Sequence, residues 1–255
     1  MTYWGEAASI AALARSGLDP ATLVFLRVGA LMALLPAFGE TKIPARLRLV
    51  LALSFSVVVF PAVKPHLPPE LSLGVAGVEV VAGLILGMGL RLLVLALQFA
   101  GSIAAQSASL SQFFASAGAE PQPALSILFT VSALALAVQA GLHVRVAELL
   151  ILSYDVLPAG SWPSTATVAE WGVAQVARAT GLAFTLAAPF VLAALLWNLA
   201  LGVMNRAMPM LPVSFIGAPA LSLGALGITA LAAGGILTVW LTVLANYLSA
   251  PMVLP

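Results

Sequence analysis

Long apolar stretches, separated by short polar or proline-rich connections, make up most of the chain. Such stretches are typical of helices that cross a membrane. The pattern predicts six apolar segments, at about residues 19–38, 47–60, 71–105, 124–157, 168–205 and 220–248. The third and fifth are longer than one crossing needs, since ~35 helical residues reach about 50 Å and the hydrocarbon core is about 30 Å thick. We therefore expect an all-α membrane protein of about six long, kinked hydrophobic segments that form helical hairpins.

Proline and glycine mark the expected ends of these segments. A short lead-in helix over residues 1–20 is predicted to end near Gly17, and Asp19-Pro20 is predicted to begin the first long helix. Pro61 is predicted to end the second helix. These positions set the boundaries expected in the first quarter of the chain.

Three interruptions are expected further along the chain. Gly141–Arg145 is predicted to break the fourth segment, and Pro189 to interrupt the fifth. Residues 206–219 contain three prolines and a glycine, which predicts an irregular loop, too apolar for solvent and packed against protein.

The composition narrows the class of protein. The chain has 255 residues, of which 62% are hydrophobic and 7% charged, whereas soluble domains carry about 25% charged residues. This excludes an ordinary soluble protein and a nucleic-acid binder, which needs a basic patch. Cysteine is absent and the two histidines, His66 and His143, lie far apart, so we expect no metal site and no cofactor. No hydrolase or phosphate-loop motif is present, and we expect no enzyme activity.

The positive charges suggest an orientation in the membrane. Lys42, Arg46 and Arg48 lie in the first connection, and Arg206 lies in the last. Cytoplasmic loops of membrane proteins are enriched in Lys and Arg. This places both connections in the cytoplasm and, with six helices, places residues 106–123 on the same side.

Charged residues also occur inside apolar segments, at Arg27, Glu79, Arg91 and Arg178. A charge in hydrocarbon costs several kcal/mol, so each should face protein, water or a counter-ion. They could line an ion or proton pathway, or they could form internal salt bridges or contact another subunit. Glu79 and Arg91 are too far apart to pair, about 18 Å along one helix. We favour the structural interpretation, because a proton relay usually needs more acidic residues.

Small residues follow Glu79 at helical spacing. Gly83 and Gly87 form a small-xxx-small pattern, which lets two helix backbones approach closely. A second small-residue face is predicted at Gly224, Gly227, Ala230 and Gly234. Two such faces favour an obligate helical assembly.

The stretch 106–123 is rich in small residues and is expected to be flexible. Most of it lies in the longest interval between two charged residues, Arg91 and Glu120. It contains the adjacent rings Phe113 and Phe114. An uncharged loop with two rings could plug a pore, or it could be an ordinary connector whose rings lie at the membrane interface.

Several motifs, in this order and spacing, resemble one family. They are Arg27, Pro36-Ala-Phe38-Gly39, Ile43-Pro44, Arg48, Glu79-x3-Gly83-x3-Gly87, Gly101 with Gln106, Glu120-Pro121, Gly141-Leu-His143, Pro158-Ala-Gly160, Asn198 to Gly202, Asn205-Arg206-Ala-Met-Pro209, and Phe215-Ile-Gly217-Ala-Pro219. The chain resembles the FliR/SctT family of type III secretion export-gate subunits, and the flagellar branch more than the injectisome branch. It departs from the family at two positions. The family usually has Gln where this chain has Met210, and a more polar residue where it has Pro212.

The resemblance implies a single membrane domain over residues 1–255, in which a FliP-like part is joined to a FliQ-like part. It implies a structural subunit of the flagellar protein export gate in the bacterial inner membrane, within the flagellar basal body. The implied partners are FliP, FliQ, FlhB and FlhA, unfolded flagellar export substrates, and membrane lipid, without nucleic acid. It also places the loop 106–123 in the lumen of the gate, which overrides its cytoplasmic placement.

Two sets of site residues follow. The expected pore plug or gasket consists of Gln106, Ser109, Ser111, Phe113, Phe114, Glu120 and Pro121. The expected helix-packing and subunit-contact residues are Arg27, Glu79, Gly83, Gly87, Arg91, Gly202, Arg206, Pro209, Gly217 and Pro219. The alternative is a stand-alone multi-pass secondary transporter that uses Glu79 and Arg91 around a cavity in the middle of the membrane.

Overall fold

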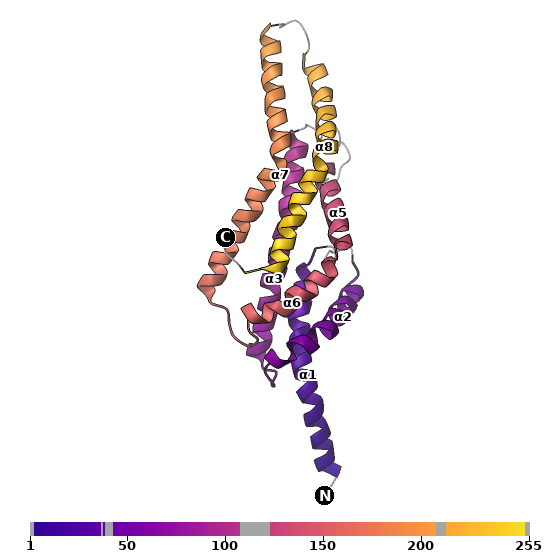
Figure 1. Cartoon of the computed structure of the whole chain (residues 1–255), viewed down its shortest axis with the longest axis vertical. Helices are drawn as coiled ribbons and strands as arrows, with labels where there is room; N and C mark the ends of the chain where they lie inside the picture. Colours follow the sequence, from indigo (N-terminus) through magenta and orange to yellow (C-terminus); the bar gives the residue numbers. More distant parts are fainter. Residues whose placement is uncertain (1–2, 37, 39–42, 108–122, 208–212, 253–255) are drawn as a thin grey trace. The chain divides into compact units, whose positions relative to one another are not determined.

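The structure is a computed structural model that describes residues 3–36, 38, 43–107, 123–207 and 213–252, with the backbone alone described for 3–17, 213–216 and 218–219. The described residues form helices (Figure 1). These are α1 (Tyr3–Leu34), α2 (Ala45–Val63), the short 3₁₀ helix η1 (Lys64–His66), α3 (Leu73–Ser107), α5 (Ala124–Gln139), α6 (Leu142–Val156), α7 (Thr165–Ala207) and α8 (Val213–Ser249). No strand occurs in this part of the chain, which confirms the all-α prediction.

Four of the helical stretches are long and apolar enough to cross a membrane by length and composition. They are Ala45–His66, Leu73–Ser107, Thr165–Ala207 and Ala220–Ser249. The bent pair α5 and α6 gives a fifth candidate if it forms one span. Over the described residues, the expectation of a helical membrane protein is therefore confirmed, with four to five candidate spans.

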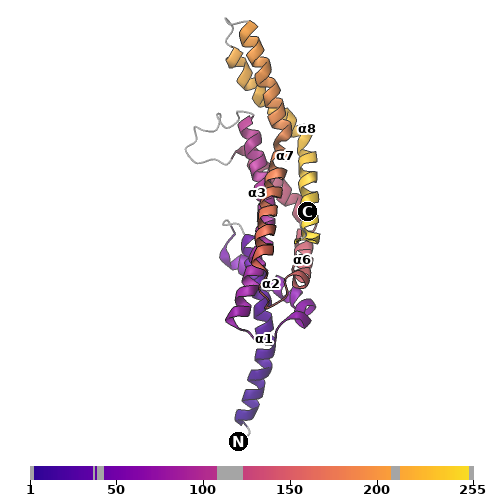
Figure 2. The same cartoon turned by 90° about the vertical axis from the view of Figure 1, so that its left-hand side faces the viewer.

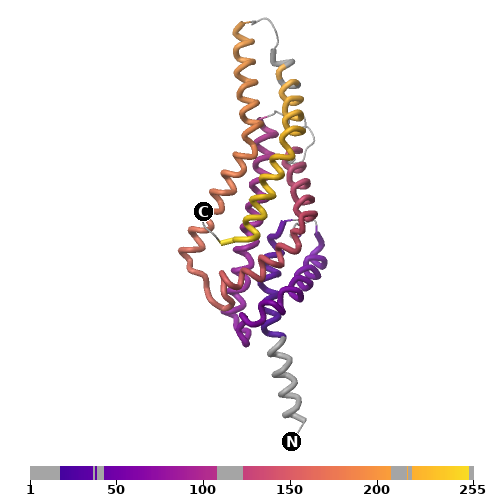
Figure 3. The backbone as a smooth tube through the Cα atoms, in the orientation of Figure 1, coloured from indigo at the N-terminus to yellow at the C-terminus, as the bar shows by residue number. Residues whose placement is uncertain are grey.

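The break in the fourth predicted segment lies at Ala140–Gly141. Gly141 has a φ of +83°, in the left-handed region that glycine enters without steric cost. Its carbonyl accepts from the amides of Val144 and Arg145, which starts α6. The break separates α5 from α6 along the backbone (Figure 3), and the predicted interruption is confirmed.

Three expected helix ends are wrong. α1 continues from Tyr3 to Leu34 through Gly17 and Pro20, so no separate lead-in helix ends near Gly17. Pro61 lies inside the last turns of α2, and Pro189 lies inside α7. A proline removes one main-chain hydrogen bond, and an apolar helix can tolerate that loss when neighbouring groups satisfy the freed carbonyl.

The irregular loop predicted for 206–219 is also wrong over most of its length. α7 reaches Ala207 and α8 begins at Val213, while residues 208–212 lie outside the described residues. The adjoining halves of α7 and α8 lie side by side (Figures 1 and 2). The Trp197 Nε1–H donates to the Gly217 carbonyl at 3.1 Å, so packing between the two helices stabilises a helical conformation that prolines disfavour.

The chain divides into two compact units. Unit 1 consists of Met1–Arg91, Ala140–Gln175 and Ala245–Pro255, and unit 2 of Leu92–Gln139 and Val176–Leu244. Unit 1 therefore holds α1, α2 and α6 with parts of α3, α7 and α8. The prediction of one membrane domain for the whole chain stays a prediction.

Aromatic side chains connect helices within each unit by bonding to main-chain carbonyls. In unit 1, the Tyr247 hydroxyl donates to the Leu86 carbonyl at 2.9 Å, and Trp171 Nε1–H donates to Pro251 at 2.9 Å. In unit 2, the Trp240 Nε1–H donates to the Leu93 carbonyl at 2.8 Å. Each bond satisfies a buried donor, as burial of a Trp or Tyr requires.

Candidate functional site

The charged centre of unit 1 is an ion pair between α1 and α3. The Arg27 Nε donates to Glu79 Oε2 at 2.8 Å, and Arg27 Nη2 donates to Glu79 Oε1 at 3.2 Å. Both side chains are 0% exposed. The two parallel bonds are the bidentate geometry in which arginine holds a carboxylate most strongly.

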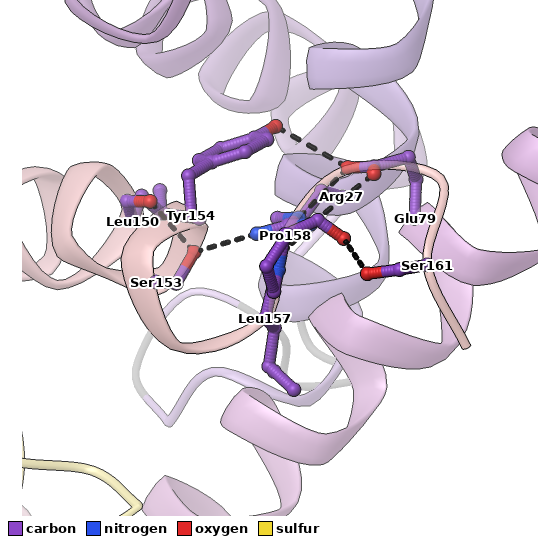
Figure 4. Close-up of polar contacts among 8 residues, drawn as sticks. All are labelled: Arg27, Glu79, Leu150, Ser153, Tyr154, Leu157, Pro158 and Ser161. Carbon is purple, nitrogen blue, oxygen red and sulfur yellow. Dashed lines mark hydrogen bonds and ion pairs between the residues drawn. The ribbon is translucent and has the colours of Figure 1, made fainter. Parts of the chain in front are cut away.

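α6 completes the coordination of the guanidinium (Figure 4). Arg27 Nη1 donates to Ser153 Oγ at 3.0 Å, and Nη2 donates to the Leu157 carbonyl at 2.8 Å. Leu157 follows the last residue of α6, so Arg27 places its charge at the negative end of that helix. The pair thus joins α1, α3 and the C-terminal end of α6.

Tyr154 covers the pair from α6. The centroid of its ring lies 3.7 Å from the Arg27 Cζ, in the position of a cation–π contact. Its hydroxyl donates to Glu79 Oε2 at 3.3 Å, and its side chain is buried. The Ser153 hydroxyl is bonded as well, since it donates to the Leu150 carbonyl at 2.7 Å.

Glycines in α3 allow the two charge-bearing helices to approach. A Cβ on Gly83 would collide with the carbonyl oxygen of Arg27 and lie 2.8 Å from the Cβ of Ala30. A Cβ on Gly87 would lie 2.9 Å from the Cβ of Leu34. The small-xxx-small pattern therefore faces α1 and gives the backbone separation at which Arg27 reaches Glu79.

This arrangement neutralises the two charges and satisfies their hydrogen-bonding groups inside protein. A buried ion pair of this kind fixes the positions of the groups that carry it and adds little net stability. Removing the two charges from water costs about as much free energy as their mutual attraction provides. Neither partner is exposed to water. The cluster is suited to fixing the relative positions of three helices.

The family model described as bacterial export proteins, family 1, matches residues 19–247. The chain belongs to the FliR family of bacterial export proteins.

Its curated relatives are flagellar biosynthetic proteins FliR. The FliR of Caulobacter vibrioides is 32% identical over 228 residues, which cover 86% of this chain and 90% of the relative. The FliR of Escherichia coli K12 is 31% identical over 201 residues, or 76% of each chain. The FliR of Bacillus subtilis 168 is 26% identical over 207 residues, or 77% of this chain and 79% of the relative. The resemblance seen in the sequence motifs is confirmed.

Within this FliR-family fold, the expected packing residues fall into different places. Arg27, Glu79, Gly83 and Gly87 come together in one cluster. Arg91 is half-buried, twelve residues beyond Glu79 on α3, and Arg178 is exposed on α7. Arg27, not Arg91, is the partner of Glu79.

The packing residues near the C-terminus also differ from one another. Gly202 and Arg206 are exposed at the end of α7. Gly217 is buried in α8, where its Cβ would lie 2.8 Å from Leu201 Cδ1. The backbone of Pro219 lies in α8, and Pro209 lies outside the described residues.

The second small-residue face on α8 packs differently from the first. Gly224, Gly227, Ala230 and Gly234 are exposed. A Cβ added to any of these three glycines would meet no atom within 4 Å. The surface around them is apolar, with Leu231 89% exposed.

The expected gasket residues lie at or beyond the end of α3. Gln106 is exposed in the last turn of α3. Ser109, Ser111, Phe113, Phe114, Glu120 and Pro121 lie outside the described residues. Their role as a plug stays a prediction.

Sequence reasoning missed the α6 side of the cluster. Ser153, Tyr154 and the Leu157 carbonyl were not among the expected site residues. The available signal was two adjacent polar side chains in an apolar segment, just before the Pro158-Ala-Gly160 motif. Across the described residues, no group of three or more His, Cys, Asp or Glu is placed to hold a metal ion.

Proposed function

We propose that this chain is a structural subunit of the flagellar type III protein export gate in the bacterial inner membrane. In this role it helps form and seal the channel through which unfolded flagellar proteins pass. The observation that carries the proposal is its alignment with 90% of the length of a FliR protein at 32% identity. The proposed partners are FliP and FliQ in the gate, with FlhB and FlhA associated with it.

The apolar surface of the long helices supports a role inside an assembly. α7 has 43 residues, which corresponds to about 65 Å of helix, roughly twice the hydrocarbon thickness of a bilayer. Only 22% of its most apolar window is buried within the chain, and the same share holds for α8. Lipid can cover only the part of the helix that lies within the hydrocarbon core. The apolar surface beyond that part favours contact with sister subunits.

The buried cluster supports a structural subunit over a transporter. An ion- or proton-coupled transporter needs an ionisable group that can reach water in at least one state. Glu79 is 0% exposed and accepts hydrogen bonds from Arg27 and Tyr154. Arg27 already neutralises this carboxylate inside the protein.

The plug forms the second part of the proposal. Phe113, Phe114 and the small polar residues around them are proposed to act as a movable gasket in the lumen of the gate. The support is the charge-free sequence between Arg91 and Glu120 and the family to which the chain belongs.

The export role is tested by deleting the gene for this chain in its native host and measuring flagellar proteins secreted into the medium. We expect secretion to stop and to return when the wild-type chain is supplied. Normal secretion in the deletion strain, together with a loss of uptake of a small solute, would contradict the proposal and favour the transporter.

The gasket has a separate test. Residues 108–122 are replaced by a Gly/Ser linker of equal length, and the conductance of membranes at rest is measured. We expect leakage of small ions in the replaced variant. Conductance equal to that of the wild type would exclude the gasket while leaving the export role intact.

A further inference from the structure

An apolar pocket lies within unit 2, at the end of α3 and between α7 and α8. Its volume is about 140 Å³. Ser107 from α3 lines one side, and two rings, Phe190 and Trp197, form the α7 wall. The remaining lining residues are Ala193, Ala194, Ala220, Leu221, Gly224, Ala225 and Ile228.

The aromatic walls of the pocket are held in place. Phe190 is buried and packs against Phe129, with ring centroids 6.2 Å apart and planes tilted by 57°. Trp197 is fixed by the hydrogen bond from its Nε1 to the Gly217 carbonyl at 3.1 Å. A pocket with fixed walls is preformed for its occupant, which lowers the entropic cost of binding.

The chemistry of the lining selects an apolar occupant. Ser107 is its one polar side chain, and the Ser107 hydroxyl already donates to the Ile103 carbonyl at 2.8 Å. Water needs two or more polar partners to be stable in a cavity, and an apolar cavity of about 150 Å³ accepts a benzene ring. The pocket therefore has the size and the polarity that suit one phenyl ring.

The chain itself provides such a ring close by. Ser107 is the last described residue before the segment 108–122, in which Phe113 and Phe114 are the only aromatic residues. Six residues of chain extend at most about 20 Å, so both rings can reach the pocket from Ser107. A tether this short gives the rings a high effective concentration at the pocket.

We propose that this pocket is the intramolecular docking site for a phenylalanine ring of the segment 108–122, from Phe113 or Phe114. The inference goes beyond the export role and does not rest on it. The ring would lie against Trp197 and Phe190, where burial of its apolar surface stabilises the docked segment.

The first test measures access to the pocket in the full-length chain, purified from its native host in a mild detergent together with the subunits that accompany it. The chain has no cysteine, so Ala220→Cys introduces a single thiol on a half-buried residue of the lining. We expect maleimide to label this thiol roughly tenfold faster when Phe113 and Phe114 are both changed to alanine. Burial of one ring favours the docked state over the undocked state on the order of tenfold, and the docked ring covers the thiol. Leu110→Ala, in the same segment, is the matched control and should not change the rate.

Labelling that is slow with and without the two rings would show that something else covers the pocket, and would overturn the proposal. Fast labelling in every variant would do so as well, because the pocket would then be empty.

The second test uses two glycines of α8. A Cβ at Gly224 or at Gly227 meets no atom within 4 Å, so both positions accept a larger side chain. Gly224 lines the pocket and Gly227 does not. We expect Gly224→Leu to fill the pocket and Gly227→Leu to leave it open.

The readout is a disulfide between Ala115→Cys and Ala220→Cys, formed under mild oxidation. We expect Gly224→Leu to reduce its yield severalfold and Gly227→Leu to leave it unchanged. Equal yields in both variants, or a disulfide that links two copies of the chain, would overturn intramolecular docking. Neither measurement depends on flagellar export, so a failure here is distinct from a failure of the proposed function.

Discussion

Arg27 on α1 holds Glu79 on α3 through two hydrogen bonds of 2.8 and 3.2 Å, although 52 residues separate them along the chain. Neither side chain is exposed. The same guanidinium bonds to Ser153 and to the Leu157 carbonyl, so one charged group positions three helices. This cluster supports the proposed structural role of this FliR-family chain.

Removing one partner of the pair should destabilise unit 1. Glu79→Gln leaves the buried guanidinium without its counter-ion, and breaking such a pair costs about 3–5 kcal/mol. Arg27→Met leaves an unpaired carboxylate and should cost a similar amount. Thermal unfolding of the complex purified in detergent through the tagged chain measures both effects, with Arg145→Gln on the exposed side of α6 as the control.

A double variant tests whether the two residues act as a pair. Arg27→Met with Glu79→Leu removes both charges and should be less destabilised than the sum of the single variants. Strict additivity would show that the pair is not coupled. Loss of export in Glu79→Gln with normal stability and assembly would contradict the structural role and favour proton coupling.

Tyr154 should contribute through its ring more than through its hydroxyl. Tyr154→Phe removes a long hydrogen bond of 3.3 Å to Glu79 but keeps the ring over Arg27, and we expect a loss of about 1 kcal/mol or less. Tyr154→Leu also removes the cation–π contact and should cost about 1–2 kcal/mol more. The melting temperatures of the two variants check this order, which the reverse ranking would contradict.

Gly83 should tolerate no side chain. Gly83→Ala places a Cβ against the backbone of Arg27, so α1 and α3 must separate and the ion pair must lengthen, at a cost of about 1–3 kcal/mol. Gly29→Ala is the matched control on α1, because a Cβ there meets no atom within 4 Å. Alanine replaces glycine favourably in a helix by about 0.5–1 kcal/mol, so Gly29→Ala should be neutral or stabilising. Equal melting temperatures for the two variants would disprove close packing at Gly83.

Gly89 should be restricted by Tyr247. A Cβ on Gly89 would collide with the Tyr247 ring, whose hydroxyl is held by the Leu86 carbonyl at 2.9 Å. Gly89→Ala should therefore destabilise the wild type by about 1–3 kcal/mol but have little effect in a Tyr247→Ala background. A double-mutant cycle measured by thermal unfolding tests this, and an unchanged effect of Gly89→Ala in that background would contradict the contact.

The helical class and the candidate spans could be predicted from the sequence because apolar length is a local property. The break at Gly141 was also predictable, since a glycine followed by polar residues in an apolar run marks a local change of backbone. The helix end expected near Gly17 and the interruption expected at Pro189 were wrong, because α1 continues through Gly17 and Pro20 and α7 continues through Pro189. The low preference of proline for helix interiors is a property of an isolated helix. In a folded protein, packing around the helix decides whether it continues through the proline.

The cluster could be predicted only in part. The buried charges of Arg27 and Glu79 and the glycines after Glu79 were recognisable, because charges are rare in apolar segments. Their pairing was not, since it joins residues 52 positions apart. Tyr154 and Ser153 were missed because neither is charged, and their role depends on where the end of α6 lies in the fold.

The central claim is that this chain works as one subunit of a hetero-oligomeric export gate. The most direct measurement is to purify the tagged chain from its native host in a mild detergent and to identify and quantify the co-purifying proteins by mass spectrometry. We predict one large complex that contains FliP and FliQ in constant ratio to this chain. A stable monomer or small homo-oligomer without them would contradict the account.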